Sequence, residues 1–137
     1  MNAKTHRLLE IFEEISRIPR CSKNEEAIAR SLDAWARAKN FPSRRDRVGN
    51  LLITVPATPG SEAAPAVVIQ GHLDMVCEKT PASTHDFTRD PIRIIHDGDW
   101  IHADETTLGA DNGVALALGL ALAEDGSLTR PKLELLF

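Results

Sequence analysis

One segment near the end of the chain restricts the fold more than any other. The stretch "GVALALGLALAEDG", residues 113–126, has the length and composition of a helix, and the glycine that ends it is a common helix stop. Apolar side chains occupy most faces of this helix, so it must be covered by other elements of the fold. We therefore expect the helix to be buried within a packed domain.

The first third of the chain predicts two more helices. Apolar residues recur at three- and four-residue steps over residues 8–18, which is typical of an amphipathic helix, and Pro19 stops it. Ser22 and Glu25 form the pattern of a capping box at the start of a second helix, which extends to about Phe41. Core packing accounts for the apolar residues of both helices.

Strand signals separate these helices from the last one. A turn at Gly49 joins two extended segments, and a second hairpin turns at Asp97-Gly98. Pro, Gly, Ser and Ala over residues 56–65 mark a surface loop, which the apolar run "AVVIQ" at 66–70 follows. The chain ends in a further strand signal, "KLELLF". This order predicts an α/β fold, a mixed β-sheet flanked by helices, in one domain over residues 1–137.

Composition excludes several classes of protein. The 137 residues are 42% hydrophobic and 26% charged, the balance of one globular domain. A net charge of -4 from interspersed charges of both signs indicates no nucleic-acid partner. No apolar run approaches the roughly 20 residues that cross a bilayer, so we expect no membrane partner. Cys21 and Cys77 have no metal-ribbon spacing, and no signal-like segment opens the chain, so we expect reduced cysteines and a cytoplasmic location.

Two titratable residues follow the apolar run "AVVIQ", which we expect to be a buried strand. His72 and Asp74 lie at its carboxyl end, where open α/β sheets gather their ligands. Side chains two apart on extended backbone point to the same side, so Asp74 can orient the imidazole of His72 as metal-bound histidines require. A metal ligand and a histidine that only makes hydrogen bonds both remain open for His72.

A second cluster, "GADNG", opens the helix near the end of the chain. Asp111 stands between two glycines, which permit tight backbone geometry and close approach to an ion or a facing chain. A carboxylate at a helix start is also favoured by the helix dipole. Metal binding and simple helix capping are therefore both open for Asp111.

Other motif interpretations fail. "GADNG" lacks the alternating acids and distant glutamate of an EF-hand, so calcium is not supported. The chain has no GxSxG elbow and no P-loop, and Cys77 has no electropositive setting that would activate its thiol. His85, His96 and His102 are interpreted as surface or hydrogen-bonding histidines.

Six short motifs spread over the chain belong together. They are "GHLDMVCEK" at 71–79, "HDF" at 85–87, "DPI" at 90–92, "DGDW" at 97–100, "TTLGADNG" at 106–113 and "LELLF" at 133–137. With their spacing they resemble the aminoacyl-histidine dipeptidases, also called cytosolic non-specific dipeptidases, a family of two-zinc metallopeptidases. The resemblance implies that residues 1–137 are the N-terminal part of a zinc-peptidase catalytic domain.

The resemblance also implies roles for individual residues. His72 matches the histidine that binds the first metal, Asp74 the catalytic carboxylate that orients this histidine, and Asp111 the aspartate that bridges both metals. A cis peptide bond is implied between Asp111 and Asn112. Two zinc ions, or other divalent metals, would lower the pKa of a shared water to about 7 and polarise the scissile carbonyl of a dipeptide.

The family pattern extends beyond this chain. It has a Glu-Glu pair a few residues after "LELLF", whose first member is the general base, as well as further ligands and an inserted lid domain. Glu134 alternates within a strand and Glu105 replaces a usual glycine, so neither is a substitute. We therefore expect the 137 residues alone to be inactive and to bind zinc weakly or not at all.

Two functions from different classes follow. The first is a cytoplasmic metallodipeptidase that hydrolyses Xaa-His and other short peptides in its full-length form, which the resemblance implies can associate as a homodimer. The alternative is a truncated, non-catalytic binding or structural module in which His72 and Asp111 are remnants. An exposed sheet edge and an apolar patch predict that the 137-residue chain self-associates.

Overall fold

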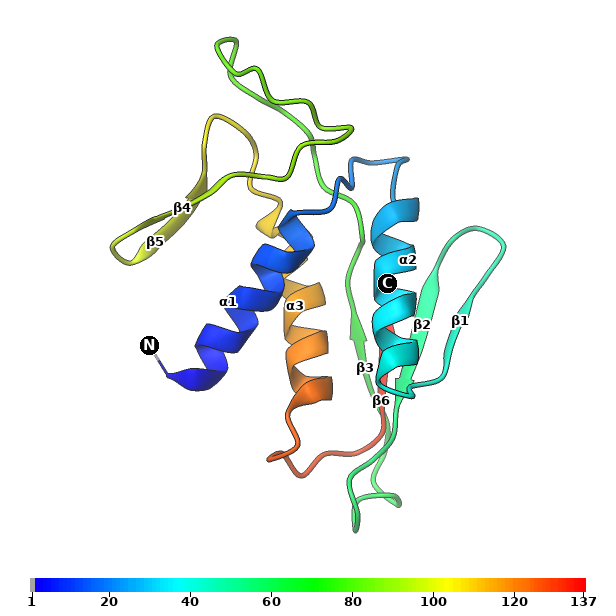
Figure 1. The fold of residues 1–137 in the computed structure, drawn as a ribbon. Helices are drawn as coiled ribbons and strands as arrows, with labels where there is room; N and C mark the ends of the chain where they lie inside the picture. The colour runs from blue at the N-terminus through cyan, green and yellow to red at the C-terminus, as the bar shows by residue number, and fades with distance from the viewer. Residues whose placement is uncertain (1) are drawn as a thin grey trace.

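Helices and strands follow one another in the predicted order (Figure 1). The computed structural model describes residues 2–137. Its elements are α1 (Ala3–Ser16), α2 (Glu26–Ala38), β1 (Ser43–Arg45), β2 (Leu51–Val55), β3 (Val67–Gln70), β4 (Ile94–Asp97), β5 (Trp100–Ala103), α3 (Ala110–Glu124) and β6 (Leu133–Leu136).

A mixed sheet forms the base of the fold, as predicted. Its strand order is β1-β2-β6-β3 within the described residues. β6 runs antiparallel to β2, with Ile53 opposite Leu135, and parallel to β3, with Val67 opposite Leu133. Between β3 and β6 the chain forms β4, β5 and α3 before it returns to the same sheet.

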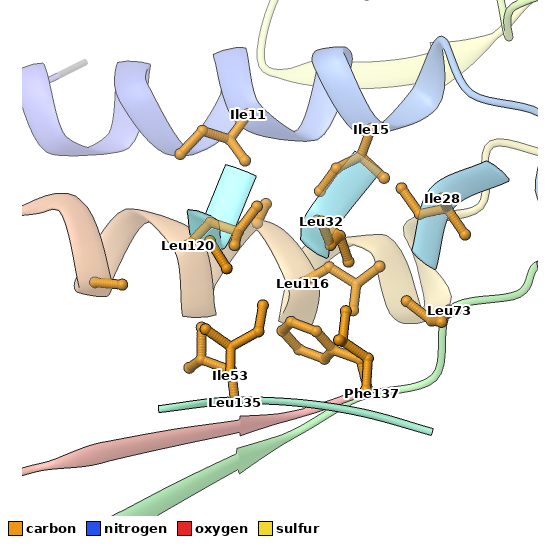
Figure 2. Close-up of a cluster of buried hydrophobic side chains, with 14 of the residues drawn as sticks. Ile11, Ile15, Ile28, Leu32, Ile53, Leu73, Leu116, Leu120, Leu135 and Phe137 are labelled. Atoms are coloured by element: carbon orange, nitrogen blue, oxygen red, sulfur yellow. The ribbon is translucent and has the colours of Figure 1, made fainter. Parts of the chain in front are cut away.

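The core lies between the helices and one face of the sheet (Figure 2). Alternate residues of β2 and β6, among them Ile53 and Leu135, are fully buried beneath α2 and α3. α1 packs on the other side of α3 and contributes Ile11 and Ile15 to the same cluster. The apolar stripe predicted for α1 is therefore confirmed as a core-facing stripe.

The predicted capping box at the start of α2 is wrong. The N-cap is Glu25, and α2 begins without a side-chain cap hydrogen bond. Ser22 instead donates its hydroxyl hydrogen bond to Asp74, far away in the sequence. Lys23 adopts a positive φ of 72°, so the helix cannot start directly after Ser22, and it begins only at Glu26. The hydroxyl oxygen of Ser22 therefore lies outside the first turn that it would have to cap.

The prediction that α3 is buried holds for part of its surface. Leu116 and Leu120 face the core, but Val114 and Leu118 are 46% and 41% exposed. The sheet and α1 cover two sides of α3, and nothing in residues 2–137 covers the remaining side. An apolar stripe of α3 thus reaches the surface.

Both predicted hairpins are present. β1 and β2 pair across a turn in which Gly49 adopts a φ of +106°, and β4 and β5 pair across a turn in which Gly98 adopts a φ of +58°. Both conformations are ones that a glycine adopts without strain. The β4–β5 pair stands apart from the main sheet. No helix between residues 2 and 137 combines the length and apolar character of a membrane span.

The two cysteines form a disulfide, which corrects the expectation that they are reduced. The Cα atoms of Cys21 and Cys77 are 5.6 Å apart, within the range that a disulfide bridges. Backbone hydrogen bonds of Met75 with Arg20 and Ser22 align the two segments. This pairing joins residues distant in sequence, so the spacing of the cysteines could not reveal it.

Candidate metal centre

His72 leaves the sheet where β3 ends and lies against the start of α3. Gly71 separates it from the last β3 residue, and a Cβ atom at Gly71 would lie only 2.9 Å from Oδ1 of Asn112. Because Gly71 has no side chain, the segment that follows β3 can pack directly against the start of α3. The fold thereby brings His72 next to Asp111, as the functional interpretation of both residues requires.

Asp74 holds one side of the His72 ring. Nδ1 of His72 lies 3.0 Å from both the backbone carbonyl oxygen and the carboxylate Oδ1 of Asp74. Both of these atoms are hydrogen-bond acceptors, so Nδ1 must carry the proton and donate it. In the neutral ring this leaves the lone pair on Nε2, which is the tautomer of a metal-binding histidine.

Asp111 faces the other side of the same ring. Its Oδ1 lies 3.2 Å from Nε2 of His72, and its side chain is 92% exposed. The α3 N-cap is Gly109, and α3 has no side-chain cap hydrogen bond among the described residues, so Asp111 is not a helix cap. The peptide bond between Asp111 and Asn112 is cis, as predicted.

Electrostatics favour a cation between these two residues. Burial acts to lower the pKa of His72, but hydrogen bonds with Asp111 and Asp74 outweigh it and raise that pKa above its ordinary value. The hydrogen bond from Ser22 lowers the pKa of Asp74, and protonated His72 adds to this effect. A neutral imidazole would turn its Nε2 lone pair toward an oxygen of Asp111, so a proton or a metal ion is needed to join them.

Sequence reasoning missed Ser22 as part of this centre. Its hydroxyl fixes the carboxylate of Asp74, which in turn fixes the ring of His72. Local spacing marked Ser22 only as a helix cap. No signal within the sequence connects it with a residue 52 positions away.

His85, His96 and Glu134 have partners outside the centre. His85 packs its ring on Phe87 with the centroids 4.5 Å apart, and His96 pairs with Glu13 at 2.8 Å. Glu134 pairs with Lys132 on β6. Within residues 2–137 no three His, Cys, Asp or Glu side chains converge as a metal site, and the candidate centre consists of His72 and Asp111 with Asp74 beside the ring.

A large cavity opens beside the centre. It has a volume of about 930 Å³ and is lined by His72 and Asp74 together with basic side chains from two other parts of the fold, Arg30 on α2 and Arg45 on β1. This volume is within the range of small-molecule sites.

The sequence is similar to known peptidases. It is 47% identical over 129 residues to the cytosol non-specific dipeptidase of Escherichia coli (strain K12), which accounts for 94% of this chain. The crystal structure of aminoacylhistidine dipeptidase from Vibrio alginolyticus superposes with a TM-score of 0.92 at 45% identity, over 95% of this chain. The chain belongs to the aminoacyl-histidine dipeptidase family.

The similarity extends over only part of the length of each relative. The chain spans 27% of the E. coli protein and 26% of the V. alginolyticus chain. A dinuclear metal binding peptidase from Bacillus subtilis shares the fold, with a TM-score of 0.56 at 13% identity over 98% of this chain and 35% of its own. No family model matches the chain.

The chain's own ligand atoms fit a zinc ion. Zinc binds imidazole nitrogen and carboxylate oxygen at about 2.0–2.2 Å, so two ligands of a tetrahedral ion lie about 3.4 Å apart. His72 Nε2 and Asp111 Oδ1 are 3.2 Å apart, with the lone pair of the nitrogen turned inward. The donor set and its spacing thus match one edge of a zinc site.

Proposed function

We propose that this chain is the N-terminal portion of the catalytic domain of a metal-dependent dipeptidase that hydrolyses Xaa-His and other short peptides. The observation that carries the proposal is the arrangement of His72, which is held by Asp74 on one side and faces Asp111 on the other. The names of the E. coli and V. alginolyticus relatives support the substrate class. The B. subtilis peptidase that shares the fold binds a dinuclear metal centre, which supports a site with two metals.

Three residues would carry the metal chemistry of this chain. His72 would hold one zinc ion through Nε2, Asp74 would keep Nδ1 protonated and the ring in place, and Asp111 would contribute its carboxylate to the metal site. The exposed carboxylate of Asp111 has room for a further partner on its solvent side. When bound, the metal ions supply a water with a lowered pKa and polarise the scissile carbonyl.

The remaining groups of the reaction would come from outside these 137 residues. A general base has to move the proton to the leaving amine. Glu134 does not serve, because it points from the middle of β6 toward Lys132. We therefore propose that the chain alone is inactive and that the full-length protein acts as a cytoplasmic enzyme, in agreement with the name of the E. coli relative.

A non-catalytic module is the second candidate. It is favoured by the lack of a third converging ligand within the described residues. In that case His72 and Asp111 would be remnants, and the apolar surface of α3 would serve a partner. The reading frame after Phe137 separates the two candidates, since a Glu-Glu pair and a late histidine support the dipeptidase and an immediate stop codon supports the module.

The activity test uses the product of the complete reading frame. We expect it to hydrolyse Xaa-His dipeptides, to lose activity in a chelator and to regain it with zinc. His72→Ala and Asp111→Asn should each reduce kcat by several orders of magnitude, whereas His96→Ala, which removes a histidine paired with Glu13 away from the centre, should not. A product that hydrolyses no dipeptide with any divalent metal contradicts the proposal.

A further inference from the structure

Arg20 is a charged residue in the interior of the fold. It lies in the turn between α1 and α2, and only 1% of its surface is exposed. Burial lowers its pKa, and the nearby charge of Asp74 opposes this effect. A buried guanidinium is costly unless its donors find acceptors, so its partners indicate what it stabilises.

Those partners are backbone carbonyls of two different segments. Nη1 of Arg20 donates to the carbonyl oxygens of Leu73 at 3.1 Å and Asp74 at 3.2 Å. Nη2 donates to the carbonyl oxygen of Gly109 at 2.6 Å. The first segment carries His72 and Asp74, and the second leads directly into Asp111. One rigid, planar group therefore connects both halves of the candidate metal centre.

The glycines on either side of Asp111 make room for this contact. A Cβ atom at Gly109 would lie 2.6 Å from Nη2 of Arg20, and one at Gly113 would lie 2.8 Å from the same atom. Real side chains do not approach so closely. Both glycines of "GADNG" thus border the guanidinium, which gives that motif a physical reason beyond the freedom of its own backbone.

We propose that Arg20 is a positioning residue that holds the His72–Asp74 segment in register with the turn that carries Asp111. Figure 1 shows that the end of α1, the carboxyl end of β3 and the start of α3 lie at the same end of the fold. The hydrogen bonds of Arg20 connect the segment after β3 with the segment before α3. Its burial keeps it away from any substrate. The role in catalysis rests on the proposed function, whereas the positioning itself does not.

The test measures amide hydrogen exchange by NMR in the metal-free 137-residue chain. The reporters are the amides of Met75 and Gly113, which donate to the carbonyls of Arg20 and Gly109. A nuclear Overhauser contact between the His72 ring and the Asp111 β protons reports the relation of the two ligands. The variant is Arg20→Met, which keeps an unbranched side chain but removes every donor.

Arg130 supplies a matched control. Its guanidinium also donates to backbone carbonyls of two separate segments, those of Pro56 and Ala123. Its own reporter is the amide of Thr58, which donates to the carbonyl of Arg130. Arg130→Met therefore removes a comparable set of contacts at a distance from His72 and Asp111.

We expect Arg20→Met to speed exchange at Met75 and Gly113 by about tenfold or more relative to Thr58, and to abolish the contact between the ligands. Arg130→Met should speed exchange at Thr58 and leave the ligand contact in place. If Arg20→Met leaves the exchange unchanged, accelerates all reporters equally or preserves the ligand contact, Arg20 is only a packing residue and the proposal is overturned.

Arg20→Lys decides the question if Arg20→Met does not fold. A single ammonium cannot reach both segments as the guanidinium fork does, so exchange at Met75 or Gly113 should still rise and the ligand contact should weaken. Wild-type exchange at both amides with a full contact overturns the proposal. Because these measurements need no metal, an inactive full-length protein would reject the proposed function without affecting this result.

Discussion

Nε2 of His72 lies 3.2 Å from Oδ1 of Asp111, although the two residues are 39 positions apart in the sequence. Asp74 holds the opposite ring nitrogen, so the lone pair of the neutral ring can only point at the carboxylate. This relationship is what makes a cation at the position between them favourable, and it is the basis of the first prediction.

The isolated chain should bind zinc weakly. With roughly half of the ligands of a complete site, the binding free energy should be about 5–8 kcal/mol, a Kd no tighter than about 1 μM. Affinity should fall as the pH is lowered through the raised pKa of His72, since the metal must displace a proton there. Isothermal calorimetry measures this, with His72→Ala as the loss variant and His96→Ala as the control. Tight binding of two zinc ions would contradict the prediction.

Glu124 should contribute to stability in a pH-dependent way. Burial acts to raise its pKa, but hydrogen bonds from Trp35 and Arg7 and the charge of Lys39 outweigh it, so the folded-state pKa is lowered. The stabilisation is therefore present above the unfolded pKa, near 4.5, and is lost as the pH falls through the folded value.

Glu124→Gln should lower the free energy of unfolding at pH 7 by roughly 1 kcal/mol and flatten its dependence on pH below about 5. Urea unfolding followed by tryptophan fluorescence measures both effects, and Trp35 donates to Glu124 at 2.8 Å. Glu10→Gln is the control, because its pair with Arg7 is exposed and should matter little. An unchanged pH profile would show that Glu124 is not responsible.

The disulfide should stabilise the chain under oxidising conditions. It closes a loop with a sequence separation of 56, for which the chain-entropy estimate is about 4 kcal/mol. The double variant Cys21→Ser, Cys77→Ser should lose stability of that order, and a dithiol reductant should remove the difference from the wild type. Equal stability in oxidising buffer would argue against the bond.

The exposed edge of the sheet should cause self-association. β3 is the last strand in the order β1-β2-β6-β3, and Val67 and Val68 are 46% and 55% exposed on it. Analytical ultracentrifugation should show concentration-dependent oligomers that Val68→Lys reduces. Val48→Lys, in the turn between β1 and β2, is the control because Val48 is 79% exposed away from that edge. A strictly monomeric wild-type chain would contradict the prediction.

Local patterns predicted most of the fold. Periodicity marked α1 and α2, the turn residues Gly49 and Gly98 marked both hairpins, and apolar runs marked β3 and β6. These features depend on neighbours within a few positions, which is why the sequence is informative about them. The positions of His72 and Asp111 were informative for a similar reason, since His72 comes just after β3 and Asp111 lies at the start of α3. The expectation that β3 is buried is wrong, because β3 lies at the edge of the sheet and its valines are exposed.

The sequence alone thus determined the order of the elements, the helical and strand faces that enter the core, and the family motifs around His72, Asp74 and Asp111. Only the tertiary structure decided that Ser22 bonds to Asp74 instead of capping α2, that Cys21 meets Cys77, and that Arg20 spans the two ligand segments. Each of these contacts joins residues more than 50 positions apart. A hydroxyl or a guanidinium donates to whichever acceptor the fold brings to it, and two thiols can be oxidised to a disulfide only where the fold brings them together. The local spacing of these residues does not reveal such distant partners.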